Sequence, residues 1–240
     1  MLPAFSIVIP AYNEAHRIGE SLRQTIAYLE SNSPESELIV VNDGSTDATS
    51  TIARNALTNA KIDNRLLQNF PNQGKGRAVR KGLLNATKPI ALFFDADLST
   101  PLGEIPKVIG PIANGDVDLA FGSRALDRSL IGTHQSFVRD RGGRVFNLLV
   151  RLSSGLPFWD TQCGFKAFRM DVCRPIVEAA HVIGFAFDVE LLLLAQRAGL
   201  RLREIPVRWN HAEGSKVHFL RDSTRMLREI FALRANAITS

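Results

Sequence analysis

Cysteine is scarce in this sequence: only Cys163 and Cys173 occur among the 240 residues. Two cysteines are too few for a disulfide framework or a cysteine zinc site. Without a signal-like start, we expect both thiols to stay reduced and the protein to be cytoplasmic. The sequence also has no run of five like charges, so we expect no nucleic-acid partner.

Long apolar runs are absent as well. No stretch reaches the roughly 18 apolar residues that a membrane-spanning helix needs. Hydrophobic residues nevertheless make up 45% of the chain, which excludes intrinsic disorder and provides for the core of a single domain. The net charge of +5 favours anionic partners, such as phosphorylated substrates or an acidic membrane surface.

Short apolar runs and amphipathic stretches alternate along the first half of the chain. The apolar runs predict strands at Phe5–Ile9, Leu38–Val41, Arg65–Asn69, Pro89–Phe94 and Val117–Phe121. Helical periodicity predicts the helices Ala15–Glu30, Asp47–Thr58, Gly74–Thr87 and Leu102–Asn114. This alternation predicts a parallel sheet with helices on both faces.

The second half of the chain is less regular. It predicts a mobile loop at Leu126–Val138, helices at Arg141–Ser153 and Phe185–Ala198, and strands at Phe165–Arg169 and Leu202–Trp209. An amphipathic helix, His218–Ala237, closes the chain. Its basic side either faces solvent while the apolar side packs on the core, or lies on an anionic membrane.

The most informative motif is Asp95-Ala96-Asp97, directly after the apolar run Ile90–Phe94. In an extended chain, residues two apart point to the same side, so both carboxylates lie together at the end of a strand. Neighbouring carboxylates repel unless a cation lies between them, and a divalent ion carrying a diphosphate meets that need. The structural alternative is that Asp97 or Ser99 caps a helix beginning near Pro101.

Polar residues follow other predicted strands and are expected at the same edge of the sheet. Glu14 and Asp43 follow the first two strands and could accept hydrogen bonds from a ribose and a nucleobase, or cap the next helices. Lys75 begins a helix between two glycines that permit close backbone approach, although this is no Walker loop. Arg124 and Arg139 suit phosphate binding, with surface solvation as the alternative for either one.

Taken together, these segments resemble the family 2 glycosyltransferases with the GT-A fold. The similarity is greatest to dolichyl-phosphate and polyprenyl-phosphate β-glucosyltransferases, with dolichyl-phosphate mannose synthases next. The matching segments lie in order over residues 5–220 and are Ile9–Glu14, Val41–Asp47, Asn72–Ala78, Asp95–Asp97, Gly122–Arg124, Asp160–Lys166 and Gly214–Lys216. The first four identify only the superfamily, whereas Asp160–Lys166 points to the lipid-phosphate glucosyl branch.

The resemblance implies roles for individual residues. Those that would hold the nucleotide are Pro10, Tyr12, Glu14, Asp43, Gly44, Lys75, Asp95, Ala96 and Asp97. Of these, Asp95 and Asp97 would hold Mg²⁺ or Mn²⁺ on the donor diphosphate. The catalytic set would be Asp97, Arg124, Arg139 and Lys216, and the acceptor side would be lined by Asp160, Gln162, Ser215 and Lys216. Asp188 and Glu190 lie in a family-like segment but receive no role.

The implied reaction is inverting transfer of glucose from UDP-glucose, a nucleotide-sugar donor, to a polyprenyl phosphate. A lipid monophosphate is largely ionised at pH 7, because its second pKa is about 6, so it needs no dedicated base. Asp160 then belongs to the wall of the acceptor site. The alternatives are GDP-mannose as donor, another acceptor, a sugar-phosphate nucleotidyltransferase, and a non-catalytic nucleotide-sugar or membrane-binding module.

We expect an α/β protein of the GT-A type, with a mostly parallel central sheet and one glycosyltransferase domain. Its parts would be a nucleotide-sugar half (1–124), an acceptor-side half (125–217) and an amphipathic C-terminal helix (218–240). Many relatives carry a membrane anchor, and this sequence shows no apolar span. We therefore expect peripheral binding to the cytoplasmic face of a membrane, or recruitment by a membrane-protein partner. Processive polymer synthesis is disfavoured, because Ile205 stands where the Gln-x-x-Arg-Trp signature needs glutamine.

Overall fold

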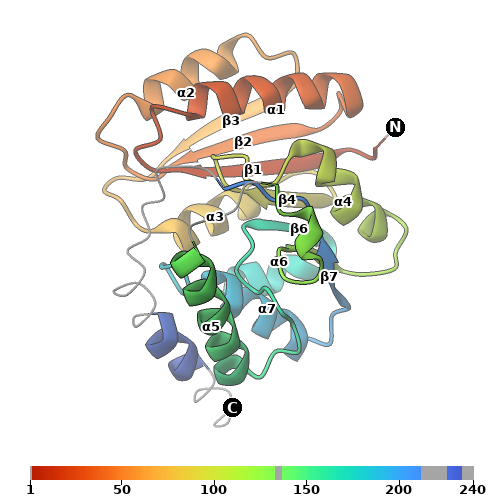
Figure 1. Cartoon of the computed structure of the whole chain (residues 1–240). Coiled ribbons are helices and arrows are strands. Elements are labelled where there is room, and N and C mark those ends of the chain that lie inside the picture. The colour runs from red at the N-terminus through yellow and green to blue at the C-terminus, as the bar shows by residue number, and fades with distance from the viewer. Residues whose placement is uncertain (1, 133–136, 212–225, 234–240) are drawn as a thin grey trace.

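A seven-stranded sheet runs through the centre of the computed structural model, in the order β3-β2-β1-β4-β6-β5-β7 (Figure 1). The structure describes residues 2–132, 137–211 and 226–233. The strands are β1 (Phe5–Ala11), β2 (Glu37–Asn42), β3 (Asp63–Gln68), β4 (Ile90–Phe94), β5 (Leu119–Ser123), β6 (Phe165–Arg169) and β7 (Leu202–Pro206).

Helices pack on both faces of this sheet. They are α1 (Ile18–Asn32), α2 (Thr49–Thr58), α3 (Lys75–Leu84), α4 (Ile105–Ala113), α5 (Phe137–Ser154), α6 (Met170–Ala179) and α7 (Phe187–Arg197), with short 3₁₀ turns η1 (Leu102–Glu104) and η2 (Arg128–Leu130). The helices α1, α2 and α4 share one hydrophobic core with the sheet. The helices α3, α5, α6 and α7 share the other.

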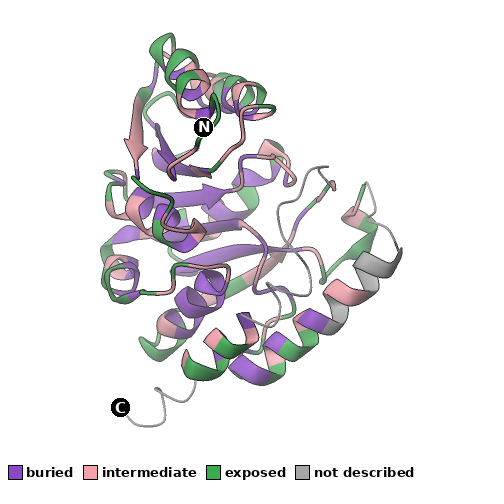
Figure 2. Cartoon of the chain, turned by 90° about the vertical axis from the view of Figure 1, so that its left-hand side faces the viewer, coloured by how far each residue is buried: buried purple, intermediate pink, exposed green. Residues whose placement is uncertain are grey.

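Side-chain alternation along the central strands separates the two cores. Phe5, Ile7 and Ile9 of β1 face the core of α1, while Val8 faces the core of α3. Residues two apart in a strand point to the same face, so a strand buried on both faces must be apolar throughout. Figure 2 shows the resulting buried strands between partly exposed helices. Two packed layers on one sheet give the loops at the strand ends a rigid support.

The sheet is mostly parallel, as predicted, and β6 is the strand that runs in the opposite direction. β6 pairs antiparallel with β4, with Phe94 opposite Phe165, and antiparallel with β5. The chain leaves β5 at the carboxyl end of the parallel strands and returns after α5 to the same edge, so β6 must run backwards. This return brings the segment just before β6 to the edge where β1, β2, β4 and β5 end.

Several boundaries also depart from the sequence-based expectation. Pro10 does not end β1, which continues to Ala11 because β4 pairs only as far as Val8 and the last residues pair with β2 alone. Helix α6, which contains Pro175, was not predicted from the sequence. Helix α5 begins before the predicted Arg141, within what was expected to be a loop.

The predicted terminal helix, His218–Ala237, is described only over residues 226–233, which are helical. Met226 and Ile230 are buried in the core of α3. For these residues the core-packed interpretation is confirmed, while the remainder of the helix lies outside the described residues. None of the helices in the described ranges is long and apolar enough to cross a membrane.

Candidate active site

Loops from five strands meet at one edge of the sheet. Polar residues follow β1, β2, β4 and β5 there, and the segment Asp160–Gly164 enters β6 from the same side. In an open α/β sheet this edge is where ligands bind. The structure therefore brings the described residues of the predicted site to one place.

The turns after β1 and β2 are interlocked. The backbone N–H of Asn13 donates to Ser45 Oγ (2.9 Å), and Thr46 N donates back to Asn13 Oδ1 (2.8 Å). Asn13 adopts a left-handed conformation (φ 53°), which asparagine tolerates better than most residues. These bonds hold the backbone between Tyr12, whose side chain is exposed, and Glu14, whose carboxylate pairs with Arg17.

Asp43 accepts hydrogen bonds from four protein groups. Asp43 Oδ1 accepts from Asn69 Nδ2 (2.8 Å) and Gln73 N (3.1 Å), and Asp43 Oδ2 accepts from Asn72 Nδ2 (2.7 Å) and Gly74 N (2.8 Å). A carboxylate has about four acceptor sites, so these donors use its capacity. In this structure Asp43 shapes the turn that leads into α3, and its predicted bond to a nucleobase stays a prediction.

Lys75 lies at the beginning of α3 and reaches the first acid of the Asp-x-Asp motif. Its Nζ is 2.6 Å from Asp95 Oδ1 and 5.8 Å from the centre of the Phe187 ring. Burial disfavours the ammonium, but the carboxylates of Asp95 and Asp188 outweigh this and raise the pKa of Lys75. A fixed positive charge therefore lies beside the motif.

The pair Asp95 and Asp97 fits a divalent ion carrying a diphosphate. Asp97 Oδ1 accepts from Ser99 N (2.9 Å) in a tight turn, and Asp97 Oδ2 lies 4.0 Å from Arg17 Nη1. The alternative, that Asp97 or Ser99 caps a helix beginning near Pro101, is wrong, because neither η1 nor α4 has a side-chain cap. No third histidine, cysteine or acid joins the pair among the described residues. Mg²⁺ is commonly bound by one or two carboxylates, with substrate phosphates and waters completing its ligands.

Arg124 and Asp160 form a bidentate ion pair next to this motif. Arg124 Nε and Nη2 donate to the two oxygens of Asp160 (2.6 and 2.8 Å), and the Arg124 backbone N–H donates as well (3.0 Å). The Trp209 ring lies 5.6 Å from the guanidinium. Burial alone would raise the pKa of Asp160, but Arg124 outweighs it and lowers that pKa. Asp160 is thus a carboxylate committed to Arg124 and is not placed to act as a base.

The rest of the segment Asp160–Lys166 lies next to the Asp-x-Asp motif. Gly164 packs so closely on Asp95 that a Cβ at this position would collide with the carboxylate. The fully buried Lys166 donates to Cys163 O (2.6 Å) and pairs with Asp188 (2.7 Å). Sequence reasoning assigned Lys166 and Asp188 no role, because only the fold shows that a lysine in an apolar strand meets an acid from α7.

The two cysteines provide no nucleophile. Both are buried, and burial raises the pKa of each thiol to about 12. Gln162 is partly buried and its side chain lies 3.9 Å from Met226 Sδ. Arg139 lies in α5, but its side chain is outside the described residues, as are Ser215 and Lys216.

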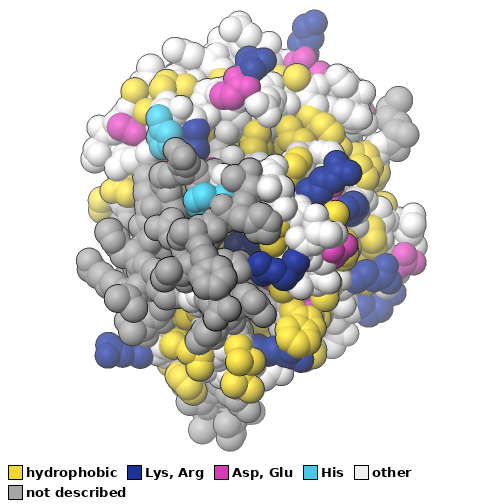
Figure 3. All heavy atoms as spheres, in the orientation of Figure 1, with side chains coloured by type: hydrophobic (Ala, Val, Ile, Leu, Met, Phe, Trp, Pro, Cys, Tyr) yellow, Lys and Arg dark blue, Asp and Glu magenta, His cyan; other side chains and the backbone are white. Residues whose placement is uncertain are grey.

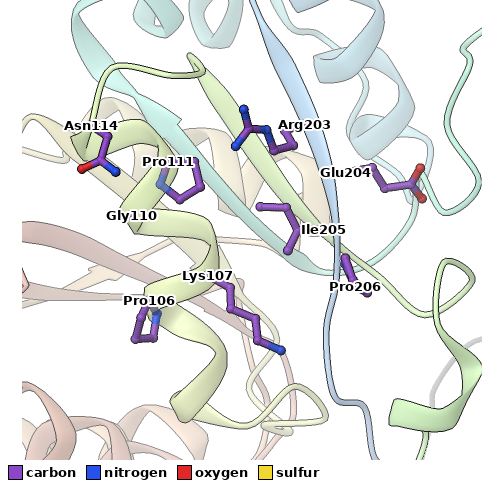
Figure 4. Close-up of a pocket in the computed structure, with 9 residues that line it drawn as sticks. All are labelled: Pro106, Lys107, Gly110, Pro111, Asn114, Arg203, Glu204, Ile205 and Pro206. Carbon is purple, nitrogen blue, oxygen red and sulfur yellow. The ribbon is translucent and has the colours of Figure 1, made fainter.

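An open groove of about 520 Å³ lies away from these residues, between α4 and β7 (Figure 4). Pro106, Lys107 and Pro111 line one side, and Arg203 and Ile205 line the other. None of the predicted site residues lines it. The site is therefore identified by convergent polar groups at the sheet edge and not by this hollow.

Known proteins share both sequence and fold with this chain. The family described as glycosyl transferase family 2 matches residues 6–176. The chain is 37% identical over 241 residues to a dolichyl-phosphate β-glucosyltransferase of Drosophila melanogaster, covering 95% of this chain and 73% of that protein. It is 34% identical over 248 residues to its counterpart in Saccharomyces cerevisiae, covering 95% and 73%.

A solved structure shows the same architecture. Glucosyl-3-phosphoglycerate synthase from Mycobacterium tuberculosis, in complex with Mn²⁺, UDP-glucose and phosphoglyceric acid, superposes with a TM-score of 0.67 and 22% identity. The match covers 97% of this chain and 79% of that one, and it shows a shared GT-A fold. The family match and the curated relatives establish that the chain belongs to glycosyl transferase family 2 and is a glycosyltransferase.

Proposed function

We propose that this protein transfers glucose from UDP-glucose to a dolichyl-type polyprenyl phosphate in a single inverting step. The observation that carries the proposal is the placement of the segment Asp160–Lys166, which resembles the lipid-phosphate glucosyl branch. Asp160 binds Arg124 and Gly164 packs on Asp95, and these contacts support our assignment of the segment to the site. The curated relatives named for this activity support the same choice of donor and acceptor.

The donor would lie across the carboxyl ends of β1, β2 and β4. Tyr12 and Glu14 follow β1 at this edge and would bind the nucleoside together with Pro10 and Gly44. A Mg²⁺ or Mn²⁺ ion held by Asp95 and Asp97 would neutralise the diphosphate and stabilise it as a leaving group. Lys75 adds a fixed positive charge on the same side.

The acceptor would lie on the Arg124 side of the motif. A phosphate oxygen of the lipid attacks the anomeric carbon, the new carbon–oxygen bond forms, and the bond to the β-phosphate breaks with its electron pair leaving on UDP. No proton has to be removed, because the attacking phosphate is already ionised at pH 7. Arg124, whose side chain is 29% exposed, would orient the attacking phosphate, and we assign Arg139 and Lys216 the same task.

Helix α5 offers a surface that suits a membrane carrying such an acceptor. Leu148, Leu149 and Leu152 are exposed on one side of the helix, while Phe146 and Val150 face the core. Beside them, Arg151 stacks on the exposed Trp159 at 4.0 Å. Leucine, tryptophan and arginine together are typical of surfaces that lie at an anionic lipid interface. In Figure 3, hydrophobic and basic side chains adjoin at the lower part of the molecule.

Replacing Leu148 and Leu149 by glutamate is expected to weaken binding to anionic phospholipid vesicles about tenfold, since two apolar contacts are lost and two negative charges are added. Sedimentation with vesicles measures this. A matched control carries Thr51→Glu and Asn55→Glu, which add the same charge at exposed positions of α2. This helix packs on the opposite face of the sheet from α5. Equal weakening in both variants would show a general charge effect and no membrane-facing role for α5.

The proposed reaction is tested by supplying the protein with Mg²⁺, a short polyprenyl phosphate and either UDP-glucose or GDP-mannose. Mass analysis of the extracted lipid is expected to show a hexosyl phospholipid with UDP-glucose. Product with GDP-mannose alone would replace glucose by mannose in the proposal. UDP release without a glycolipid would support the donor site and refute the lipid acceptor.

A further inference from the structure

Two buried acids at the start of α7 have no role in the reaction described above. Glu190 is 1% exposed, and its carboxylate accepts from the backbone N–H of His181 (3.0 Å) and of Val182 (2.9 Å). His181 Nδ1 lies 2.9 Å from the same group. Hydrogen bonds to a charged acceptor are among the stronger ones in proteins. Glu190 therefore fixes the segment 181–183, which is part of the connection between α6 and α7.

The turn that carries Lys75 packs directly against this segment. The carbonyl of Ile183 accepts from Gly76 N (2.9 Å). A side chain at Gly74 would collide with Ile183 O, and one at Gly76 would collide with Val182 O and Phe187. Because both glycines flank Lys75, the backbone of Lys75 is held directly against the segment that Glu190 fixes.

The opposite side of the same turn is held by Asp43 through the N–H groups of Gln73 and Gly74. The turn that carries Lys75 is thus held on two sides: Asp43 binds the turn directly, and Glu190 holds the segment 181–183 on which the turn packs. From this position Lys75 Nζ reaches Asp95 at 2.6 Å. A shift of the segment 181–183 would move Lys75 relative to the Asp-x-Asp motif.

We propose that Glu190 is a positioning residue, which sets the affinity for the nucleoside diphosphate through the segment 181–183 and Lys75 without touching the ligand. The inference rests on the proposed function in one respect, namely that Lys75 faces the donor diphosphate. It assigns to Glu190 a task that the sequence pattern alone does not reveal, because the acid lies far along the chain from Lys75.

The test compares Glu190→Gln with Glu178→Gln, a control at an exposed position of α6. Glutamine keeps the shape of Glu190 but removes its charge and one acceptor. Titration calorimetry with UDP and Mg²⁺ is expected to show about tenfold weaker binding for Glu190→Gln and an unchanged affinity for Glu178→Gln. In a Lys75→Met background, Glu190→Gln is expected to cause no further loss, since both act through one contact. Equal losses in both backgrounds, or unchanged affinity, would overturn the proposal.

A second variant reaches the same contact from the other side. Gly76→Ala introduces the colliding Cβ at Val182 O and leaves Glu190 intact, so it covers the case in which Glu190→Gln fails to fold. Its expected loss in UDP affinity matches that of Glu190→Gln. Unchanged UDP affinity in Gly76→Ala would contradict the proposal.

Hydrogen exchange of the ligand-free protein separates this inference from the donor assignment. Amides over residues 74–79 are expected to exchange faster in Glu190→Gln than in Glu178→Gln, because the bond from Gly76 N to Ile183 O is loosened. Unchanged exchange would overturn the inference. Absence of UDP binding by the unmodified protein, with faster exchange in Glu190→Gln, would refute the donor assignment alone.

Discussion

Asp97→Ala is expected to lower kcat about a thousandfold, even at saturating Mg²⁺, while the fold stays intact. The carboxylate is 26% exposed and accepts from Ser99 N in a local turn, so its loss removes little packing. In the proposed mechanism, Asp97 is an oxygen ligand of the metal ion at the place where charge develops on the departing diphosphate, and the variant removes that ligand. The measurement is the rate of glycolipid formation across a Mg²⁺ titration, together with a thermal melt.

Asp171→Ala is the matched control for Asp97→Ala. Asp171 is an exposed acid that also accepts from a nearby backbone N–H, that of Val172, but it follows β6 at the opposite edge of the sheet. The control is expected to keep the full rate. If Asp97→Ala retained most of its turnover with saturating metal, Asp97 would not be a metal ligand.

Arg124→Ala is expected to destabilise the protein by about 3–5 kcal/mol, because it leaves the fully buried Asp160 carboxylate without its partner. For a chain of this length, that lowers the melting temperature by roughly 6–20 °C. It also abolishes glycolipid formation, since the guanidinium is assigned to the attacking phosphate. Thermal denaturation and the transfer assay measure the two effects separately.

The double variant Arg124→Met with Asp160→Leu separates stability from activity. Replacing both partners of a buried pair by apolar residues is often neutral for stability, so a melting temperature near the original is expected, without activity. A double variant that remained active would contradict the role of Arg124 in phosphate binding.

The pH dependence of the same comparison has a defined sign. The pKa of Asp160 is lowered in the folded state, so its stabilising effect is present above the unfolded pKa of about 3.9 and is lost as pH falls further. The melting temperatures of the original and double variant proteins should therefore differ by a constant amount between about pH 5 and pH 8. Below about pH 4, the melting temperature of the original protein should fall relative to that of the double variant, which lacks Asp160.

Local sequence signals predicted the parts of the site that depend on neighbouring residues. The apolar run Ile90–Phe94 forms β4, and Asp95 and Asp97 follow it as expected. The alternation of strands and helices predicted a mostly parallel sheet, and the resemblance to the GT-A family is confirmed by the family match. These features follow from periodicity and turn chemistry, which are readable from short windows.

The contacts that organise the site depend on residues far apart in sequence and were not predicted. The reversal of β6 depends on the path of the chain through α5. The saturation of Asp43 by residues of the α3 turn depends on the packing of β2 against β3. The pair formed by Lys166 and Asp188 depends on α7 lying behind β6. In each case the contact joins residues that are far apart in the sequence, so neither residue reveals its partner before the fold is known.

The most direct test of the account is the anomeric configuration of the product. The protein is incubated with UDP-glucose, in which glucose is α-linked, Mg²⁺ and a polyprenyl phosphate, and the purified glycolipid is analysed by NMR spectroscopy. Attack by the lipid phosphate in a single step predicts β-linked glucosyl phosphate. An α-linked product, or glucose found on no lipid phosphate, would contradict the account.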